Sequence, residues 1–213
     1  MLMQKLLYIF IVLIISINAA GQNDPAAVSI LDKFSSAATA APSISMKFIM
    51  ITDDQLEQTK DTISGSVILS KDNYRLDLPD NIIYYNGETN WSFLPAEKEV
   101  TITKPDRNND SFESRPSSIF TMYKKGYKCR LVEERKDSYI IDLYPDEIKN
   151  ELIRVRLIIK KSTLHPVSFE YKRRDGLTMT LVVKEYSLKQ NTEPGMFKFS
   201  PEKHKGVEVI DMR

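Results

Sequence analysis

The stretch Tyr84-Tyr85-Asn86-Gly87-Glu88-Thr89-Asn90-Trp91-Ser92-Phe93-Leu94-Pro95 decides the fold of this chain. Asn-Gly between two apolar runs is the strongest short-range signal of a β-hairpin, because both residues tolerate the positive φ of a tight turn. Side chains alternate along a strand, so Trp91 and Phe93 share one face, and Ser92 and Leu94 share the other. We expect this hairpin to be part of a larger sheet, with Trp91 lining a core or a cavity.

The N-terminus has the pattern of a secretory signal peptide. Lys5 precedes an unbroken apolar run at residues 6–15, and the small residues Ala19-Ala20-Gly21 follow it. The run is too short for a membrane-spanning helix, which needs about 20 apolar residues. We expect cleavage after Gly21 and a mature chain that begins at Gln22. No cysteine lies near this junction, so we expect no lipid anchor.

Composition limits the classes of protein that the mature chain can belong to. Its length of roughly 190 residues suits one domain. The whole chain has 30 basic and 29 acidic residues, which leaves no basic excess for non-specific nucleic-acid binding. Cys129 is the only cysteine, so no intramolecular disulfide can form. The domain must therefore be stable by burial alone.

Two segments have helical patterns. The first begins at Asp24-Pro25, a start signal, and its apolar residues recur at helical spacing. The second is residues 116–123, which follow a polar loop at residues 105–110 and have an apolar side. The pattern of the first segment is typical of a helix packed on a core, and the same pattern fits a helix that covers an apolar opening; the second segment is a second candidate cover. The apolar residues concerned are Val28, Leu31, Phe34 and Ala38 in the first segment, and Ile119, Phe120 and Met122 in the second.

Elsewhere the apolar residues recur at every second position, which predicts β-strands. Short strands joined by tight turns indicate an antiparallel meander. Besides the hairpin, the expected strands cover residues 44–50, 63–70, 74–78, 127–133, 138–144, 152–160, 165–173 and 177–186.

A sheet of at least eight strands with one apolar face must be covered, paired with a second sheet or curled on itself. The two helical segments are the only cover that the sequence offers. We therefore expect a strongly curled sheet with the helical segments over its mouth and an apolar hollow inside. A closed β-sandwich is the alternative.

Residues for catalysis or metal binding are scarce. His165 and His204 have no second ligand at metal-binding spacing, and no G-x-S-x-G elbow or glycine-rich phosphate loop occurs. Residues 106–110 begin like a calcium loop, but Ser111 and Ser117 stand where glycine and glutamate are required. Cys129 lies inside a strand. We expect no enzymatic activity, no metal site and no cofactor.

Four stretches together resemble the periplasmic outer-membrane lipoprotein carrier family, LolA. The first is Asn86-Gly87-x-x-x-Trp91-x-Phe93-x-Pro95, in which an Asn-Gly turn leads into a strand with Trp, an aromatic residue and Pro. The others are residues 65–71, like the family's second strand; 116–120, like the start of its lid helix; and 197–213, like its ending. The stretches come in the family's order and span nearly all of the mature chain.

The resemblance implies a mainly β fold for residues 22–213: an incomplete, half-open antiparallel β-barrel of about eleven strands, with a helical lid over an apolar cavity. It also implies a monomeric periplasmic carrier that shields the acyl chains of lipoproteins between the inner and outer membranes. The implied partners are acylated lipoproteins, an inner-membrane lipoprotein-releasing ABC complex and an outer-membrane acceptor. A binder or sensor of another lipid, and a non-catalytic interaction module of the same fold, are the alternatives.

The expected lid residues are Val28, Leu31, Phe34, Ile119, Phe120 and Met122. Many family members hold the lid shut with an arginine after the second strand. This chain has Lys71 at that place. Because lysine lacks the planar guanidinium group of arginine, we treat Lys71 only as a candidate for the residue that holds the lid. The expected cavity residues on the sheet face are Met46, Phe48, Val67, Leu69, Leu76, Trp91, Phe93, Ile141, Leu143, Val155, Leu157, Phe169, Met179 and Leu181.

Overall fold

The computed structural model describes residues 23–106 and 112–213, so the expected signal peptide lies outside the described residues. The described helices are α2 (Pro25–Ala40) and three short 3₁₀ helices, η1 (Pro116–Phe120), η2 (Met122–Lys124) and η3 (Pro201–Lys203). The described strands are β1 (Ile44–Asp54), β2 (Thr59–Ser70), β3 (Asn73–Asp77), β4 (Ile82–Tyr85), β5 (Asn90–Leu94), β6 (Glu99–Thr103), β7 (Tyr127–Glu134), β8 (Ser138–Pro145), β9 (Leu152–Lys160), β10 (Pro166–Arg173), β11 (Leu177–Ser187) and β12 (Glu208–Asp211).

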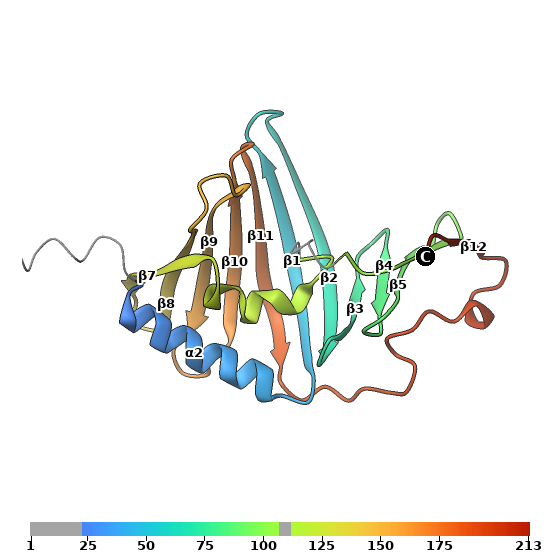
Figure 1. The fold of residues 1–213 in the computed structure, drawn as a ribbon, viewed down its shortest axis with the longest axis horizontal. Helices are drawn as coiled ribbons and strands as arrows, with labels where there is room; N and C mark the ends of the chain where they lie inside the picture. Colours follow the sequence, from blue (N-terminus) through green and yellow to red (C-terminus); the bar gives the residue numbers. More distant parts are fainter. Residues whose placement is uncertain (1–22, 107–111) are drawn as a thin grey trace, which may run out of the picture.

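The strands form a single sheet in the order β12-β6-β5-β4-β3-β2-β1-β11-β10-β9-β8-β7 (Figure 1). Neighbours are antiparallel except β12, which runs parallel to β6. The end strands β12 and β7 do not pair, so the sheet is open, and the expected open β-barrel with a helical lid is confirmed. It has one strand more than expected, because the tail adds β12. The alternative of a closed sandwich is wrong, since the described residues form no second sheet.

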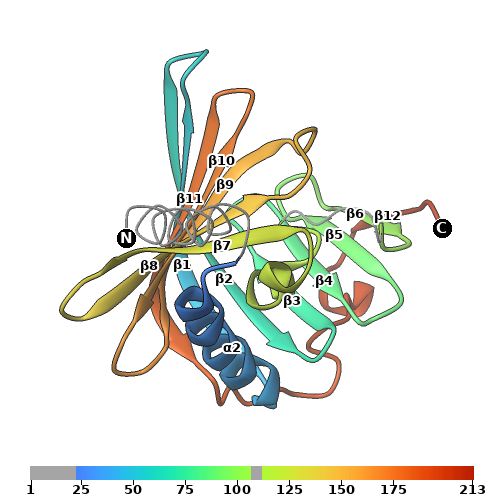
Figure 2. The same ribbon diagram turned by 60° about the vertical axis from the view of Figure 1, so that its left-hand side comes forward.

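Helix α2 lies along one face of the sheet, and η1 and η2 lie beside it on that face (Figures 1 and 2). Asp24 caps the helix: its Oδ1 accepts hydrogen bonds from the backbone N–H of Ala26 at 2.9 Å and Ala27 at 3.4 Å. The helix ends before Pro42, which restricts Ala41 to an extended conformation. We call the face that carries α2 the inner face and the opposite side of the sheet the outer face.

The hairpin between β4 and β5 is confirmed. Tyr85 pairs with Asn90, so residues 86–89 form the loop, and Gly87 supplies its positive φ of 93°. Asn86 Oδ1 accepts hydrogen bonds from the backbone N–H of Glu88 at 3.1 Å and Thr89 at 2.9 Å. The side chain of Asn86 thus stabilises the turn, as short polar side chains do in such loops.

The main core lies between the inner face and α2. Strand register shows which residues share this face: Met46 pairs with Val67, and Val67 pairs with Leu76. Gly65 of β2 makes room for an aromatic ring, because a Cβ at this position would lie 2.5 Å from Cζ of Phe48. The sheet therefore packs closely around Phe48.

A second, smaller core lies on the outer face, at the β12 end of the sheet. Trp91 pairs with Tyr84, and Tyr84 pairs with Arg75, whose neighbour Leu76 points inward. The buried residues of this core are Tyr84, Trp91, Phe93, Val100 and Phe199. Trp91 and Phe93 do share a face, but the expectation that they line the inner cavity is wrong. The apolar side of the sheet changes from inner to outer between β2 and β5.

The C-terminal segment covers this second core. After β11 the chain runs past the ends of β1, β2 and β3 and reaches the far end of the sheet (Figure 1). The ring of Phe199 lies 5.0 Å from that of Phe93 and 6.0 Å from that of Tyr84, and His204 stacks on Phe199 at 5.0 Å. The segment then ends in β12. Trp91 and Phe93 are buried by this segment and have no part in the inner core.

Candidate functional site

The inner face brings together the other twelve expected cavity residues. Eleven of them are buried in one apolar cluster with α2, and Met179 is partly buried against that cluster. The eleven buried residues are Met46, Phe48, Val67, Leu69, Leu76, Ile141, Leu143, Val155, Leu157, Phe169 and Leu181. They come from β1, β2, β3, β8, β9, β10 and β11, so one continuous apolar wall extends across these strands.

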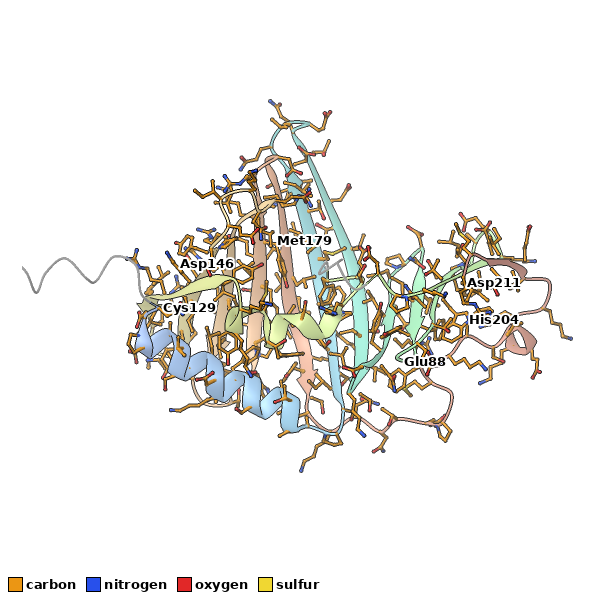
Figure 3. All side chains as sticks on the ribbon, viewed as in Figure 1. Glu88, Cys129, Asp146, Met179, His204 and Asp211 are labelled. Atoms are coloured by element: carbon orange, nitrogen blue, oxygen red, sulfur yellow. The ribbon has the colours of Figure 1, made fainter. Side chains whose placement is uncertain are left out.

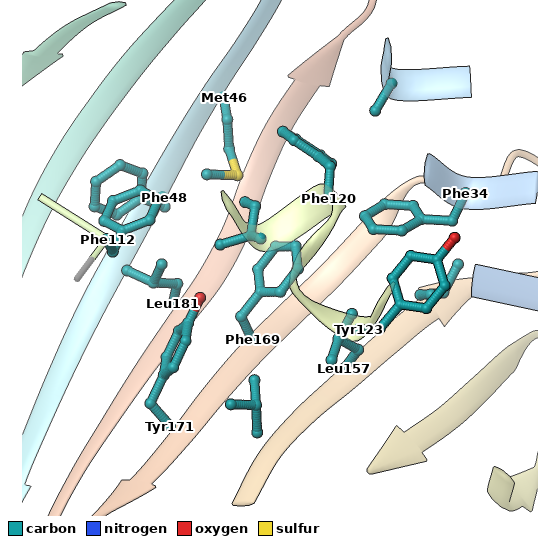
Figure 4. Close-up of a cluster of buried hydrophobic side chains, with 14 of the residues drawn as sticks. Phe34, Met46, Phe48, Phe112, Phe120, Tyr123, Leu157, Phe169, Tyr171 and Leu181 are labelled. Carbon is teal, nitrogen blue, oxygen red and sulfur yellow. The ribbon is translucent and has the colours of Figure 1, made fainter. Parts of the chain in front are cut away.

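The expected lid residues pack on this wall. Leu31, Phe34, Ile119 and Phe120 are buried in the same cluster, while Val28 and Met122 are partly buried against it. The ring of Phe34 lies 5.5 Å from that of Phe120 and 6.4 Å from that of Phe169 (Figure 4). We call α2, η1 and η2 the lid. Its apolar side chains fill the part of the wall that it covers, so the structure shows a closed state.

A pocket of about 1170 Å³ remains beside η1 and η2, on the part of the inner face that α2 does not cover. Its apolar lining includes Met122, Tyr127, Tyr171, Leu177 and Met179. Figure 3 shows Met179 in the part of the sheet remote from α2. The volume is slightly above the range of about 300–1000 Å³ that holds small ligands.

Exposed charged residues also line this pocket. Lys125 and Lys149 contribute cations, and Asp72 and Glu113 contribute carboxylates. Arg173 is held by Asp175 at 2.7 Å. A lining that combines apolar and charged side chains suits an amphiphilic ligand.

The predicted latch, Lys71, does not fasten the lid in this structure. It lies in the turn after β2 with a φ of 55°, and its side chain makes no hydrogen bond or ion pair with the described part of the lid. Tyr74 fastens the lid instead. Its hydroxyl lies 3.1 Å from the carbonyl oxygens of both Glu113 and Ser114, which precede η1. Burial raises the pKa of Tyr74, so this hydroxyl keeps its proton and remains a donor at neutral pH.

A second tyrosine joins the two parts of the lid. Tyr123 of η2 donates a hydrogen bond to Oδ1 of Asp32 on α2 at 2.5 Å. Burial and this hydrogen bond raise the pKa of Tyr123 to about 12. The start of α2 is also fixed to β7, since the backbone N–H of Leu131 donates to Oδ2 of Asp24 at 3.1 Å. Polar contacts of Tyr74 and Asp24 therefore connect the lid region to the sheet, and the Tyr123–Asp32 hydrogen bond joins the two parts of the lid.

Two side chains of reactive types, Cys129 and His165, pack among other residues of the described chain. Cys129 is buried near the start of α2 (Figure 3), and burial raises the pKa of its thiol to about 11, which keeps it protonated and a poor nucleophile. His165 packs edge-on against Tyr186 at 4.9 Å. Residues 23–106 and 112–213 contain no cluster of three or more His, Cys, Asp or Glu side chains that could hold a metal. In the same ranges, no helix has the length and apolar character needed to cross a membrane.

Comparison with known families agrees with this geometry. The profile of the family described as "Outer membrane lipoprotein carrier protein LolA" matches residues 17–176, about three quarters of the chain. The chain belongs to the LolA family. The match includes the hairpin, the lid and all strands from β1 to β10. It ends before β11, so the resemblance of residues 197–213 to the LolA ending stays a prediction.

Solved structures are similar to this LolA-family chain at low sequence identity. An uncharacterized conserved protein from Thermus thermophilus is 14% identical with a TM-score of 0.58, over 87% of this chain and 99% of that one, which shows a shared fold. A LolA superfamily protein from Nitrosomonas europaea is 14% identical with a TM-score of 0.43, over 81% and 97% of the two chains. The lipoprotein LppX of Mycobacterium tuberculosis is 10% identical with a TM-score of 0.45, over 80% and 100%. No curated protein matches the chain.

Sequence reasoning missed several residues of the site. Tyr171 and Leu177 line the pocket, and each stands two positions from an expected residue, Phe169 and Met179, on the same face. Strand alternation could therefore have found both. Nothing in the sequence indicated Tyr74 as a latch, because its partners are backbone carbonyls on a distant segment.

Proposed function

We propose that this LolA-family chain is a periplasmic, non-catalytic carrier that shields the acyl chains of lipoproteins and moves them from the inner to the outer membrane. One observation carries the proposal: an apolar wall of seven strands is covered by one helix and two short 3₁₀ helices, and a pocket with apolar and charged lining lies beside them. A second sheet would cover such a wall permanently. A helical lid can leave it.

The energetics of acyl-chain burial suit reversible binding. Burying a chain of about sixteen carbons is worth about 12 kcal/mol, at about 0.8 kcal/mol per methylene. In the closed state Phe34, Ile119 and Phe120 are at most 3% exposed. Exposing each of these side chains costs about 1.5–3 kcal/mol, so their displacement offsets about half of the gain. The lid thus keeps affinity low enough for release.

Delivery requires a donor and an acceptor. The family description names an outer-membrane lipoprotein carrier. In our proposal the carrier receives its cargo from an inner-membrane lipoprotein-releasing ABC complex and passes it to an outer-membrane acceptor. In the same proposal, residues 1–21 are the signal peptide that directs the chain to the periplasm.

A detergent-removal assay tests the proposal. An acylated lipoprotein in detergent is mixed with the carrier, the detergent is removed, and soluble lipoprotein is measured. The same lipoprotein without its acylated cysteine is the control for protein–protein contact. We expect the carrier to keep only the acylated form in a soluble one-to-one complex. Precipitation of the acylated form with and without the carrier would refute the proposal.

A further inference from the structure

The outer face of β8 carries a buried carboxylate. Asp142 is 1% exposed, and its neighbours Ile141 and Leu143 point into the inner core, so Asp142 points to the opposite side of the sheet. Arg156 of β9 donates to both carboxylate oxygens, from Nε at 2.7 Å and from Nη2 at 2.8 Å. The hydroxyl of Tyr144 donates to Oδ2 at 3.0 Å. The guanidinium of Arg156 and the ring of Tyr144 are therefore fixed in position on the outer face.

Cations outnumber carboxylates around this site. Strand pairing places four residues of alternating charge in one row, Arg130, Asp142, Arg156 and Glu170. The adjacent row on the same face has no carboxylate and contains Lys128, Tyr144, Arg154 and Lys172. The two rows together hold five cations and two carboxylates, although the charges of the whole chain nearly balance. The positive charge is thus concentrated on the outer face of β7 to β10.

The two carboxylates already have partners within the face. Glu170 accepts a hydrogen bond from Nη2 of Arg154, and Asp142 is held by Arg156. Lys128 is exposed and Lys172 is partly exposed, and neither forms an ion pair with the described residues. An anionic partner would therefore meet two free ammonium groups beside guanidinium groups whose orientation is already set.

An apolar row lies on the other side of the Asp142 row. Strand pairing aligns its members, which are Ile140, Ile158, Val182 and Ile49. Ile140 is buried and the other three are partly exposed. These short side chains lie beside longer charged ones, so they are poorly placed to enter a lipid bilayer. A peptide that lies along the sheet can cover them.

We propose that the outer face of β7 to β10 docks an acidic, extended segment of a protein partner. Its carboxylates pair with Lys128, Arg154 and Lys172, and its apolar side chains cover the row that contains Ile158. Arginine and tyrosine are enriched at the centres of protein interfaces, and side chains that are already fixed lose little freedom on binding. The lid and the large pocket lie on the inner face, so docking here requires no movement of the lid and does not depend on the proposed cargo.

A designed peptide tests this surface. Lys128 and Arg154 lie two strand spacings apart, which is about 10 Å. A short peptide of Glu-Leu-Ser repeats also places successive carboxylates about 10 Å apart when it is extended. We expect calorimetry to detect its binding, and NMR titration to shift the amide signals of Lys128, Tyr144 and Arg154. The same peptide with Gln in place of Glu should bind about tenfold more weakly or less.

The double variant Lys128→Glu/Lys172→Glu should weaken binding of the acidic peptide about tenfold or more, because like charges then face each other. Neither lysine has an ion pair to lose, so we expect this variant to fold. Lys160→Glu/Lys184→Glu is the matched control. It makes the same change of charge on the same face, about 20 Å further along β9 and β11, and should bind the peptide as the wild type does.

Three results would overturn the proposal. The first is equal peptide affinity in the two double variants. The second is a set of NMR shifts confined to the inner face, such as those of Tyr171 and Met179, and this readout needs no variant. The third is binding of the wild type to phosphatidylglycerol vesicles without binding of the peptide, which would assign the surface to a membrane. The detergent-removal assay is a separate measurement, so the carrier function stands or falls independently.

Discussion

The hydroxyl of Tyr74 on β3 lies 3.1 Å from the carbonyl oxygen of Ser114, so a strand of the sheet holds the segment that leads into the lid. The same hydroxyl lies equally close to the carbonyl oxygen of Glu113. Because one phenolic proton serves both acceptors, these contacts together are worth about one hydrogen bond, about 0.5–1.5 kcal/mol. A free energy of this size stabilises the closed lid and still allows it to open.

Tyr74→Phe should loosen the lid. We expect a loss of about 1 kcal/mol in the free energy of unfolding, faster amide exchange in residues 112–124, and severalfold tighter binding of an acylated ligand, since less energy is needed to open. Hydrogen exchange by mass spectrometry measures the local effect. Tyr85→Phe is the matched control, because the Tyr85 hydroxyl donates to Gly87 in the hairpin and does not contact the lid.

Lys71→Gln tests whether the lid is held by Tyr74, as the structure indicates, or by Lys71, as the family resemblance suggested. Since Lys71 makes no polar contact with the described part of the lid, exchange in residues 112–124 should not change. Faster exchange in Lys71→Gln than in Tyr74→Phe would contradict the assignment of the latch to Tyr74.

Gly65→Ala should destabilise the inner core. The added Cβ would lie 2.5 Å from Cζ and 2.7 Å from Cε2 of Phe48, whose ring also packs edge-on against Phe112 at 5.4 Å. We expect a cost of about 1–3 kcal/mol, which denaturant unfolding measures. Ser66→Ala, one residue along the same strand, should change stability by less than about 0.5 kcal/mol. Equal stabilities of the two variants would contradict the packing described.

Much of this fold could be predicted from the sequence. Period-two alternation located most of the strands, helical spacing located α2, and the Asn86-Gly87 turn located the hairpin between β4 and β5. Alternation also showed that Trp91 and Phe93 share a face. Alternation could not show whether this shared face is the inner or the outer face of the sheet, because the answer depends on which segment covers the strand. Here the cover is Phe199, which lies far along the chain in the C-terminal segment.

The site was predictable to a similar extent. Residues on the inner wall follow from alternation, and the lid residues follow from helical spacing. The polar contacts that hold the lid did not follow, since Tyr74 and Tyr123 reach partners that are far away in the sequence. The parallel strand β12 was also missed, because a four-residue strand at the end of a chain gives little periodic signal.

Phe199→Ala tests the separation of the two cores. Removal of this ring should expose Trp91, shift its emission to longer wavelength and cost about 3–5 kcal/mol of stability. Binding of an acylated ligand should be unaffected in the folded variant, because the ligand lies on the inner face.

In the wild type, ligand binding should leave the Trp91 emission unchanged. A ligand-dependent shift of that emission would place the ligand on the outer face.

Alkaline pH should destabilise the closed lid. Burial and the hydrogen bond to Asp32 raise the pKa of Tyr123 from 10.0 to about 12, and burial raises the pKa of Cys129 from 9.0 to about 11. The neutral forms are favoured in the folded protein, so their contribution to stability is complete below pH 9 and is lost as the pH rises through 11 and 12.

Urea unfolding at a series of pH values measures this effect. The free energy of unfolding should fall progressively above pH 9, and the fall should be smaller in Tyr123→Phe, which has no proton to lose at this position. An identical pH dependence in the wild type and in Tyr123→Phe would contradict the role assigned to the Tyr123 hydroxyl.

The most direct test of the carrier function is native mass spectrometry of the protein purified from the periplasm of its own cells without detergent. The account predicts a population with the mass of one carrier plus one acylated lipoprotein, and Tyr74→Phe should increase that population. Recovery of the unbound protein alone, from cells that contain abundant acylated lipoproteins, would contradict the account.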